Sequence, residues 1–197
     1  MFARLEACRA ALRARLAEPH RAYHAQSHVD SMLRGMAALP GPLAHAAAME
    51  LAVWYHDAIY DPAARDNEAR SAALLRADLS GLVHPQVIGV AAEMIRLTAG
   101  HEIPPDLPEN WRRDVALFLD LDLAVLGADP PEYDAYERGI AAEYEPVHGR
   151  EAYRTGRAAF LRGLLDRPRL FHTEGFHAAL DGKARANIRR ALERPPA

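Results

Sequence analysis

The chain has 197 residues, of which 50% are hydrophobic and 7% aromatic. Its formal net charge is −3, so no basic field indicates nucleic acid, and its single cysteine, Cys8, excludes a disulfide within the chain. The first residues lack the hydrophobic region of a signal peptide, and no run of about 18 apolar residues predicts a membrane span. We therefore expect a cytoplasmic protein without membrane contact.

The predicted fold class is all-α. Ala, Leu, Arg and Glu recur throughout the chain, which favours helix over sheet. No linker divides the sequence, so we expect one domain over 1–197, a compact multi-helix bundle. Its C-terminal helices, over 131–193, are expected to pack on the rest. Apolar residues at helical spacing predict helices over about 2–18, 24–39, 43–59, a segment opening at 66, 85–98, 115–127, 131–145, 150–166 and 174–193.

The segment from Leu51 to Asp61 is apolar apart from its closing aspartate and one adjacent pair, His56 and Asp57. An imidazole and a carboxylate are costly to bury unless both are satisfied. A divalent metal would satisfy both groups. A hydrogen-bonded core histidine is the more frequent explanation for a pair that stands alone. The expected position near a helix C-terminus, where free carbonyls carry partial negative charge, favours a cation.

Three further segments carry groups that suit a metal site. His24 and His28 are four residues apart and can share one helix face. Asp120 and Asp122 lie in an apolar helix but diverge by about 200° around its axis, so one of them at most can face a site. His101 lies in a loop, where ligands are often found. Each group also has a simpler explanation, as a solvated or structural histidine or as a buried aspartate bonded to the backbone.

The segment that follows the His-Asp pair, Asp66-Asn67-Glu68-Ala69-Arg70, opens a helix with Asp66 at the N-cap. Acidic residues in a first turn often compensate the helix dipole. The competing interpretation is a catalytic carboxylate, Glu68, and a phosphate-binding Arg70, because this segment must stay near His56 and Asp57.

The order His28, His56-Asp57, Asp122 resembles the HD superfamily of metal-dependent phosphohydrolases. Within it, the chain is similar to a bacterial group described as predicted metal-dependent HD phosphohydrolases, and the resemblance covers nearly the whole chain. One departure is Ala141, which stands where an arginine commonly precedes the Glu-Tyr pair and could affect affinity for substrate. The matching pieces are Tyr23-His24 with His28 and Met32-Leu33, Trp54 to Tyr60, Asp66-Asn67-Glu68 with Arg70-Ser71-Ala72, Thr98 with His101, Leu119 to Leu123 with Leu126-Gly127, Tyr133 with Tyr136, Glu143-Tyr144, Gly156-Arg157, and Ala184 to Asn187.

This resemblance implies an HD-like helical bundle whose metal site is drawn from 24–122, with a divalent metal ion held by His28, His56, Asp57 and Asp122. Asp120 is the alternative to Asp122. The ion would be Mn, Mg, Fe, Zn, Co or Ni. His24 and His101 would add ligands for a second ion or contact phosphate.

The implied activity is hydrolysis of a phosphomonoester or nucleotide-type small molecule. Asp57 would hold the ion that activates water, and Glu68 would position or deprotonate that water. Arg70, or Arg65, would offset phosphate charge. Two alternatives stand beside this hypothesis: a non-catalytic metal- or nucleotide-binding protein, and an HD-type di-iron oxygenase. The expected partner is a phosphorylated small molecule, and the sequence is compatible with a homodimer.

Overall fold

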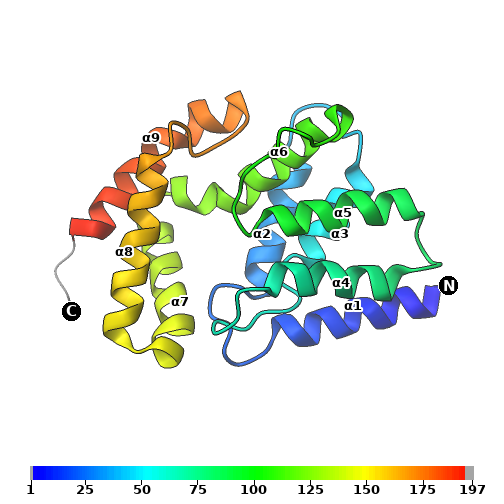
Figure 1. Ribbon diagram of the computed structural model, residues 1–197, viewed down its shortest axis with the longest axis horizontal. Coiled ribbons are helices and arrows are strands. Elements are labelled where there is room, and N and C mark those ends of the chain that lie inside the picture. The colour runs from blue at the N-terminus through cyan, green and yellow to red at the C-terminus, as the bar shows by residue number, and fades with distance from the viewer. Residues whose placement is uncertain (1, 194–197) are drawn as a thin grey trace.

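Residues 2–193 form nine α-helices and one short 3₁₀ helix, and they contain no strand (Figure 1). The computed structural model describes residues 2–193. The helices are α1 (Phe2–Leu16), α2 (Gln26–Ala37), α3 (Ala46–Tyr55), α4 (Asn67–Leu79), α5 (Pro85–Leu97), α6 (Glu109–Leu123), the 3₁₀ helix η1 (Ala124–Gly127), α7 (Pro130–His148), α8 (Arg150–Asp166) and α9 (Glu174–Glu193). No helix in this part of the chain is long and apolar enough to cross a membrane.

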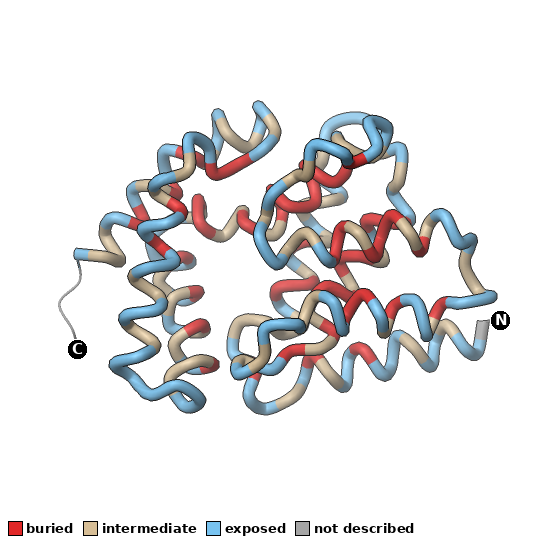
Figure 2. Tube along the Cα trace, in the orientation of Figure 1, coloured by how far each residue is buried: buried red, intermediate tan, exposed pale blue. Residues whose placement is uncertain are grey.

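The buried apolar side chains form two separate clusters. The first cluster joins α1 to α6, and the second joins η1, α7, α8 and α9. Figure 1 shows the corresponding two groups of helices side by side, and Figure 2 shows that buried segments recur along the helices of both. The boundary falls inside one turn of helix, because Leu121 belongs to the first cluster and Leu123 to the second. Asp122 therefore lies at the seam between the two cores.

Helix α3 is the centre of the first cluster. It packs against α2, α4, α5 and α6. Its sequence is apolar on nearly every side, as expected for a helix that is surrounded by others. Ala52 and Val53 are fully buried, and His56 follows as the C-cap residue. The burial of α3 thus places the His-Asp pair inside the protein.

The predicted helices are confirmed, with differences at their ends. The helix expected over 43–59 is shorter, Ala46–Tyr55, so His56 and Asp57 follow its last turn. The helix expected over 24–39 begins at Gln26, because the backbone N–H groups before it bind a carboxylate of α7 instead of continuing the helix. Helix α6 begins at Glu109, one and a half turns before its apolar run. The same segment changes to 3₁₀ geometry after Leu123, and Gly127 ends η1.

Gly127 has a packing role that its sequence position does not reveal. A Cβ atom at this position would lie 2.7 Å from the Cβ of Leu180 and 3.0 Å from its carbonyl oxygen. The absent side chain therefore lets η1 approach α9 closely. Asn187 of α9 strengthens this contact by donating to the carbonyl oxygens of Leu126 and Ala128.

Candidate metal centre

Three helices bring His28, His56 and Asp122 together. Nε2 of His28 lies 3.0 Å from Oδ1 of Asp122, and Nε2 of His56 lies 3.7 Å from the same oxygen. Each residue offers one ligand atom, and the three atoms lie within 4.8 Å of one another. Both histidines are buried. This group could hold a metal ion, because imidazole nitrogen and carboxylate oxygen are common ligands of divalent metals.

The orientation of His56 is fixed by the backbone of its own helix. Nδ1 of His56 lies 2.9 Å from the carbonyl oxygen of Val53. A carbonyl can only accept, so Nδ1 carries a hydrogen and donates it. In the neutral imidazole, Nε2 then keeps its lone pair and points toward Asp57 and Asp122. A metal-binding histidine is commonly held by a second hydrogen bond of this kind.

Asp57 joins the group through His56. Its Oδ2 lies 3.0 Å from Nε2 of His56, and both atoms are buried without a hydrogen-bond partner among the described residues. Two lone pairs that face each other at this distance need either a proton or a cation between them. Burial disfavours the charged imidazole, but the carboxylates of Asp57 and Asp122 outweigh it and raise the pKa of His56 to about 9. The pair therefore attracts positive charge.

Asp122 binds histidines on both of its oxygens. Besides the contact of Oδ1 with His28, its Oδ2 lies 2.8 Å from Nε2 of His101. Burial acts to raise the pKa of Asp122, but the contacts with His101 and His28 hold it well below its usual range. His101 has a positive φ of 51°, which is uncommon for a residue with a side chain. This left-handed turn at the end of α5 places His101 beside the candidate metal centre.

Asp120 faces away from this centre, as its angular position on α6 predicts. Its Oδ1 accepts from the backbone N–H of His172 at 2.6 Å. Its Oδ2 accepts from the N–H and the hydroxyl of Thr173, at 2.8 and 2.6 Å. Asp120 is completely buried, so these three bonds offset the cost of burying its charge. It fixes the loop that leads into α9.

Glu143 of α7 holds the chain segment that carries His24. One oxygen, Oε1, accepts from the backbone N–H groups of Ala22, Tyr23 and His24 at 2.6–2.9 Å. The other, Oε2, lies 2.6 Å from Nδ1 of His24 and accepts from the hydroxyl of Tyr60 at 2.7 Å. Burial acts to raise the pKa of Glu143, but these partners, His24 first, lower it to about 2. Its carboxylate links the second core to the first beside the metal centre.

Arg21 fixes the backbone that follows α3. Its guanidinium donates to the carbonyl oxygen of Asp57 at 2.6 Å and to that of His24 at 3.0 Å. A weaker bond reaches the carbonyl oxygen of Ala58 at 3.3 Å. The side chain is fully buried, and Glu18 balances its charge at 3.1 Å. Arg21 is therefore a structural clamp on the loop that carries Asp57.

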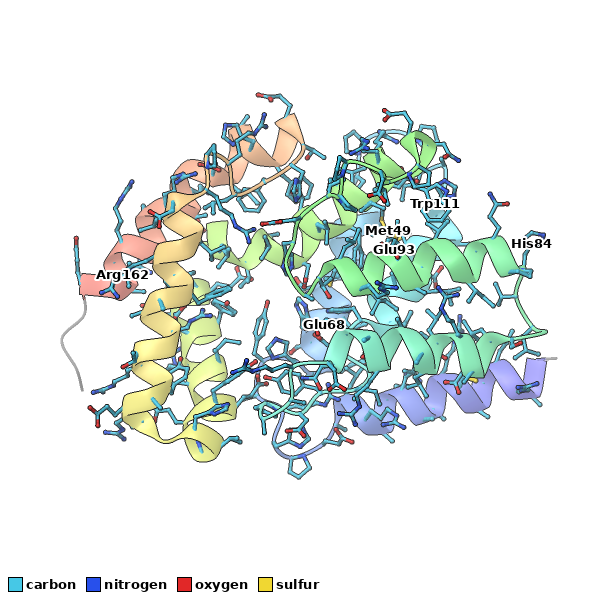
Figure 3. The ribbon with its side chains drawn as sticks, in the orientation of Figure 1. Met49, Glu68, His84, Glu93, Trp111 and Arg162 are labelled. Carbon is cyan, nitrogen blue, oxygen red and sulfur yellow. The ribbon has the colours of Figure 1, made fainter. Side chains whose placement is uncertain are left out.

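A cavity of about 550 Å³ opens beside the centre. Glu68, at the start of α4, lies on the side of its helix group that faces α7 and α8 (Figure 3). The cavity is lined by Tyr23, His24, Glu68, Thr98, Ala99, His101, Asp122, Leu123, Val125, Leu126, Tyr136, Ile140, Tyr144, His148, Ala152, Tyr153, Gly156, Arg157 and Phe160. The structure thus brings Glu68, His24 and His101 to the same cavity as Asp122.

The arginines expected at this cavity lie elsewhere. Arg70 lines a different cavity, and its half-exposed guanidinium lies 3.7 Å from Asp66. Helix α4 turns Arg70 away because it lies two residues, about 200°, beyond Glu68. Arg65 is exposed in the preceding loop. The arginine that does line the cavity is Arg157 of α8.

Sequence reasoning left the roles of Glu143, Arg21 and Arg157 open, although Glu143 and Arg157 stand within matching pieces of the resemblance. A further signal for Glu143 was present, because it continues the buried stripe of Tyr133, Tyr136 and Ile140 on α7, where an acidic side chain needs partners. No comparable periodic pattern marks Arg21 or Arg157.

Comparison of the chain with protein-family models, with curated proteins and with solved structures found no match. The features that describe residues 2–193 are nine α-helices, the absence of strands, and a buried group of two histidines and one aspartate that could hold a metal ion.

We expect the two aspartates of α6 to differ in their effect on metal binding. Asp122→Asn should lower affinity for Mn²⁺ by more than about 10-fold, because even outer partners of metal ligands contribute that much. Asp120→Asn should retain the metal and lower the free energy of unfolding by about 1–3 kcal/mol, since it leaves buried donors poorly paired. Calorimetric titration with Mn²⁺ and urea unfolding measure the two effects. Equal loss of metal in both variants would contradict this assignment.

We expect Glu143→Gln to change the acid stability of the protein. The folded-state pKa of Glu143, about 2, lies below its ordinary value of 4.5, so its stabilising contribution is present above about pH 4.5 and is lost as the pH falls through 2. The shift corresponds to at most about 3 kcal/mol. Urea unfolding between pH 2 and 7 should show a smaller loss of stability on acidification in the variant. Glu145→Gln, on the same helix, is the control and should follow the native protein.

Proposed function

We propose that the chain is a metal-dependent phosphohydrolase of the HD type that acts on a phosphomonoester or nucleotide-type small molecule. The observation that carries this proposal is the pair of buried atoms, Nε2 of His56 and Oδ2 of Asp57, which lie 3.0 Å apart without hydrogen bonds among the described residues. A cation between them would satisfy both. His28 and Asp122 lie next to this pair and complete the set of residues expected from the HD pattern.

The donor set suits a divalent ion of intermediate softness. His28, His56, Asp57 and Asp122 would hold the ion with two nitrogen and two oxygen donors, a combination compatible with Mn, Fe, Co, Ni or Zn and, less favourably, Mg. When bound, such an ion lowers the pKa of a coordinated water and polarises a phosphoryl oxygen. Helices α2 and α6 and the turn that ends α3 carry the donors, and the hydrogen bonds of Val53 and Arg21 hold that turn.

Glu68 is the candidate for the residue that positions or deprotonates the attacking water. It lines the cavity that Asp122 also lines, and it is not among the three residues that group around a common centre. A general base must reach the reacting water without being consumed as a metal ligand. Its place in the lining of the cavity that Asp122 also lines supports this role.

The phosphate would meet positive charge from histidines. His24 and His101 both line the cavity. Burial acts to lower the pKa of His24, but Asp57 and Glu143 raise it above its usual value, which favours the charged imidazolium. His24 would therefore offset the charge of a phosphoryl group, a role that the position of Arg70 does not support.

Glu68→Gln tests the proposed activity. Loss of general base assistance typically costs about 10²–10⁴-fold in rate, so kcat of the Mn²⁺-loaded enzyme should fall by that factor while bound manganese is unchanged. Glu109→Gln is the matched control, because Glu109 also stands in the first turn of a helix, where loss of the charge costs about 0.3–1 kcal/mol of stability.

Turnover of phosphomonoesters and nucleotides, melting temperature and metal content are measured for both variants. Equal turnover in the native protein and Glu68→Gln would show that Glu68 compensates the helix dipole and is not the general base. Binding of manganese without hydrolysis by the native protein would overturn the phosphohydrolase proposal and support a non-catalytic metal-binding protein.

A further inference from the structure

The metal-facing cavity, which Asp122 lines, contains two chemically different sets of side chains. The polar set consists of His24, Glu68, His101 and Asp122, the groups discussed above. The aromatic set comes from α7 and α8 and is called the aromatic wall; it consists of Tyr136, Tyr144, Tyr153 and Phe160. Apolar side chains of α6, η1 and α7 complete this part of the lining. A pocket that combines a few polar groups with apolar and aromatic side chains is typical of a small-molecule site.

The aromatic wall presents ring faces and edges. The rings of Tyr144 and Tyr153 lie 6.5 Å apart and are tilted by 30°. The guanidinium of Arg157 lies over Tyr136 at 5.0 Å and over Phe160 at 5.1 Å. Aromatic rings prefer such tilted or offset neighbours at centroid distances of about 4.5–7 Å, so the wall is suited to contact another planar ring.

Phe160 is at the surface although it is a large apolar residue. Its exposed fraction is 48%, a value that it shares with Val147. Phe160 lines the metal-facing cavity, whereas Val147 lines the separate cavity that contains Arg70. An exposed phenyl ring at the edge of a cavity would gain burial when a ligand covers it.

The charges of the cavity limit the number of phosphates. Arg157 is the one arginine or lysine among its described lining residues. Its guanidinium is bound by both oxygens of Glu137, with Nη2 at 2.6 Å and Nε at 3.3 Å. Glu68 and Asp122 add negative charge to the same lining. A triphosphate would lack cationic partners here, while a single phosphate could be met by the metal centre and the histidines.

We propose that the substrate is a phosphate monoester whose alcohol part carries an aromatic or heteroaromatic ring, with the ring bound against the face of α8 that carries Tyr153 and Phe160. This inference rests on the proposed function for the placement of the phosphate beside the candidate metal centre. A nucleoside monophosphate and an aryl phosphate share this chemistry, and the test below separates them.

Binding of non-hydrolysable compounds tests the ring site without relying on turnover. The full chain loaded with Mn²⁺ is titrated with phenylphosphonate and with methylphosphonate. Phenylphosphonate should bind at least about 10-fold more tightly in the native protein. Phe160→Ala and Tyr153→Leu should each reduce this preference by about 2- to 10-fold, the range expected for loss of one aromatic contact. Val147→Ala, equally exposed but outside this cavity, should leave the preference unchanged.

Hydrolysis distinguishes the sources of the ring. A nucleoside 5′-monophosphate, phenyl phosphate, glycerol phosphate and a nucleoside triphosphate are compared, and either of the first two should be turned over faster than the last two. Preferential binding of phenylphosphonate without hydrolysis of any compound would support the ring site and overturn the proposed function. Equal binding of the two phosphonates, or faster hydrolysis of glycerol phosphate, would overturn the ring site and leave the proposed function standing.

Discussion

At the end of α3, Nε2 of His56 and Oδ2 of Asp57 face each other 3.0 Å apart. Both atoms are buried, and neither has a hydrogen-bond partner among the described residues. Such a contact is unfavourable without positive charge. Its surroundings hold it in place: α3 is enclosed by four other helices, the carbonyl of Val53 orients the imidazole, and Arg21 binds the carbonyl of Asp57. The packing around α3 thus holds these two polar groups together, and the raised pKa of His56 reflects the positive charge that they attract.

The division of the molecule into two cores has a consequence for the site. Asp122 lies between Leu121 of one core and Leu123 of the other, so its carboxylate meets histidines from the first core at the seam. Glu143 crosses the same seam in the opposite direction and binds the segment around His24. The second helix group therefore contributes both a support for the residues of the candidate metal centre and the aromatic wall of the cavity.

Helix periodicity determined what could be predicted from the sequence. It placed Asp120 and Asp122 on opposite sides of α6, and the structure agrees because a buried helix leaves little angular freedom. It failed for His24, whose backbone N–H binds a carboxylate 119 residues away rather than the next turn of a helix. The position of Arg157 likewise depends on how α8 packs against α7, a tertiary contact that leaves no local pattern in the sequence.

The location of a bound metal tests the central claim most directly. Crystals grown with Mn²⁺ and measured for anomalous scattering would show the ion itself. The account predicts a peak enclosed by Nε2 of His56, Nε2 of His28 and the carboxylates of Asp57 and Asp122. A fully loaded protein with its peak elsewhere, or a hydrogen-bonded water at this position with no anomalous signal, would contradict it.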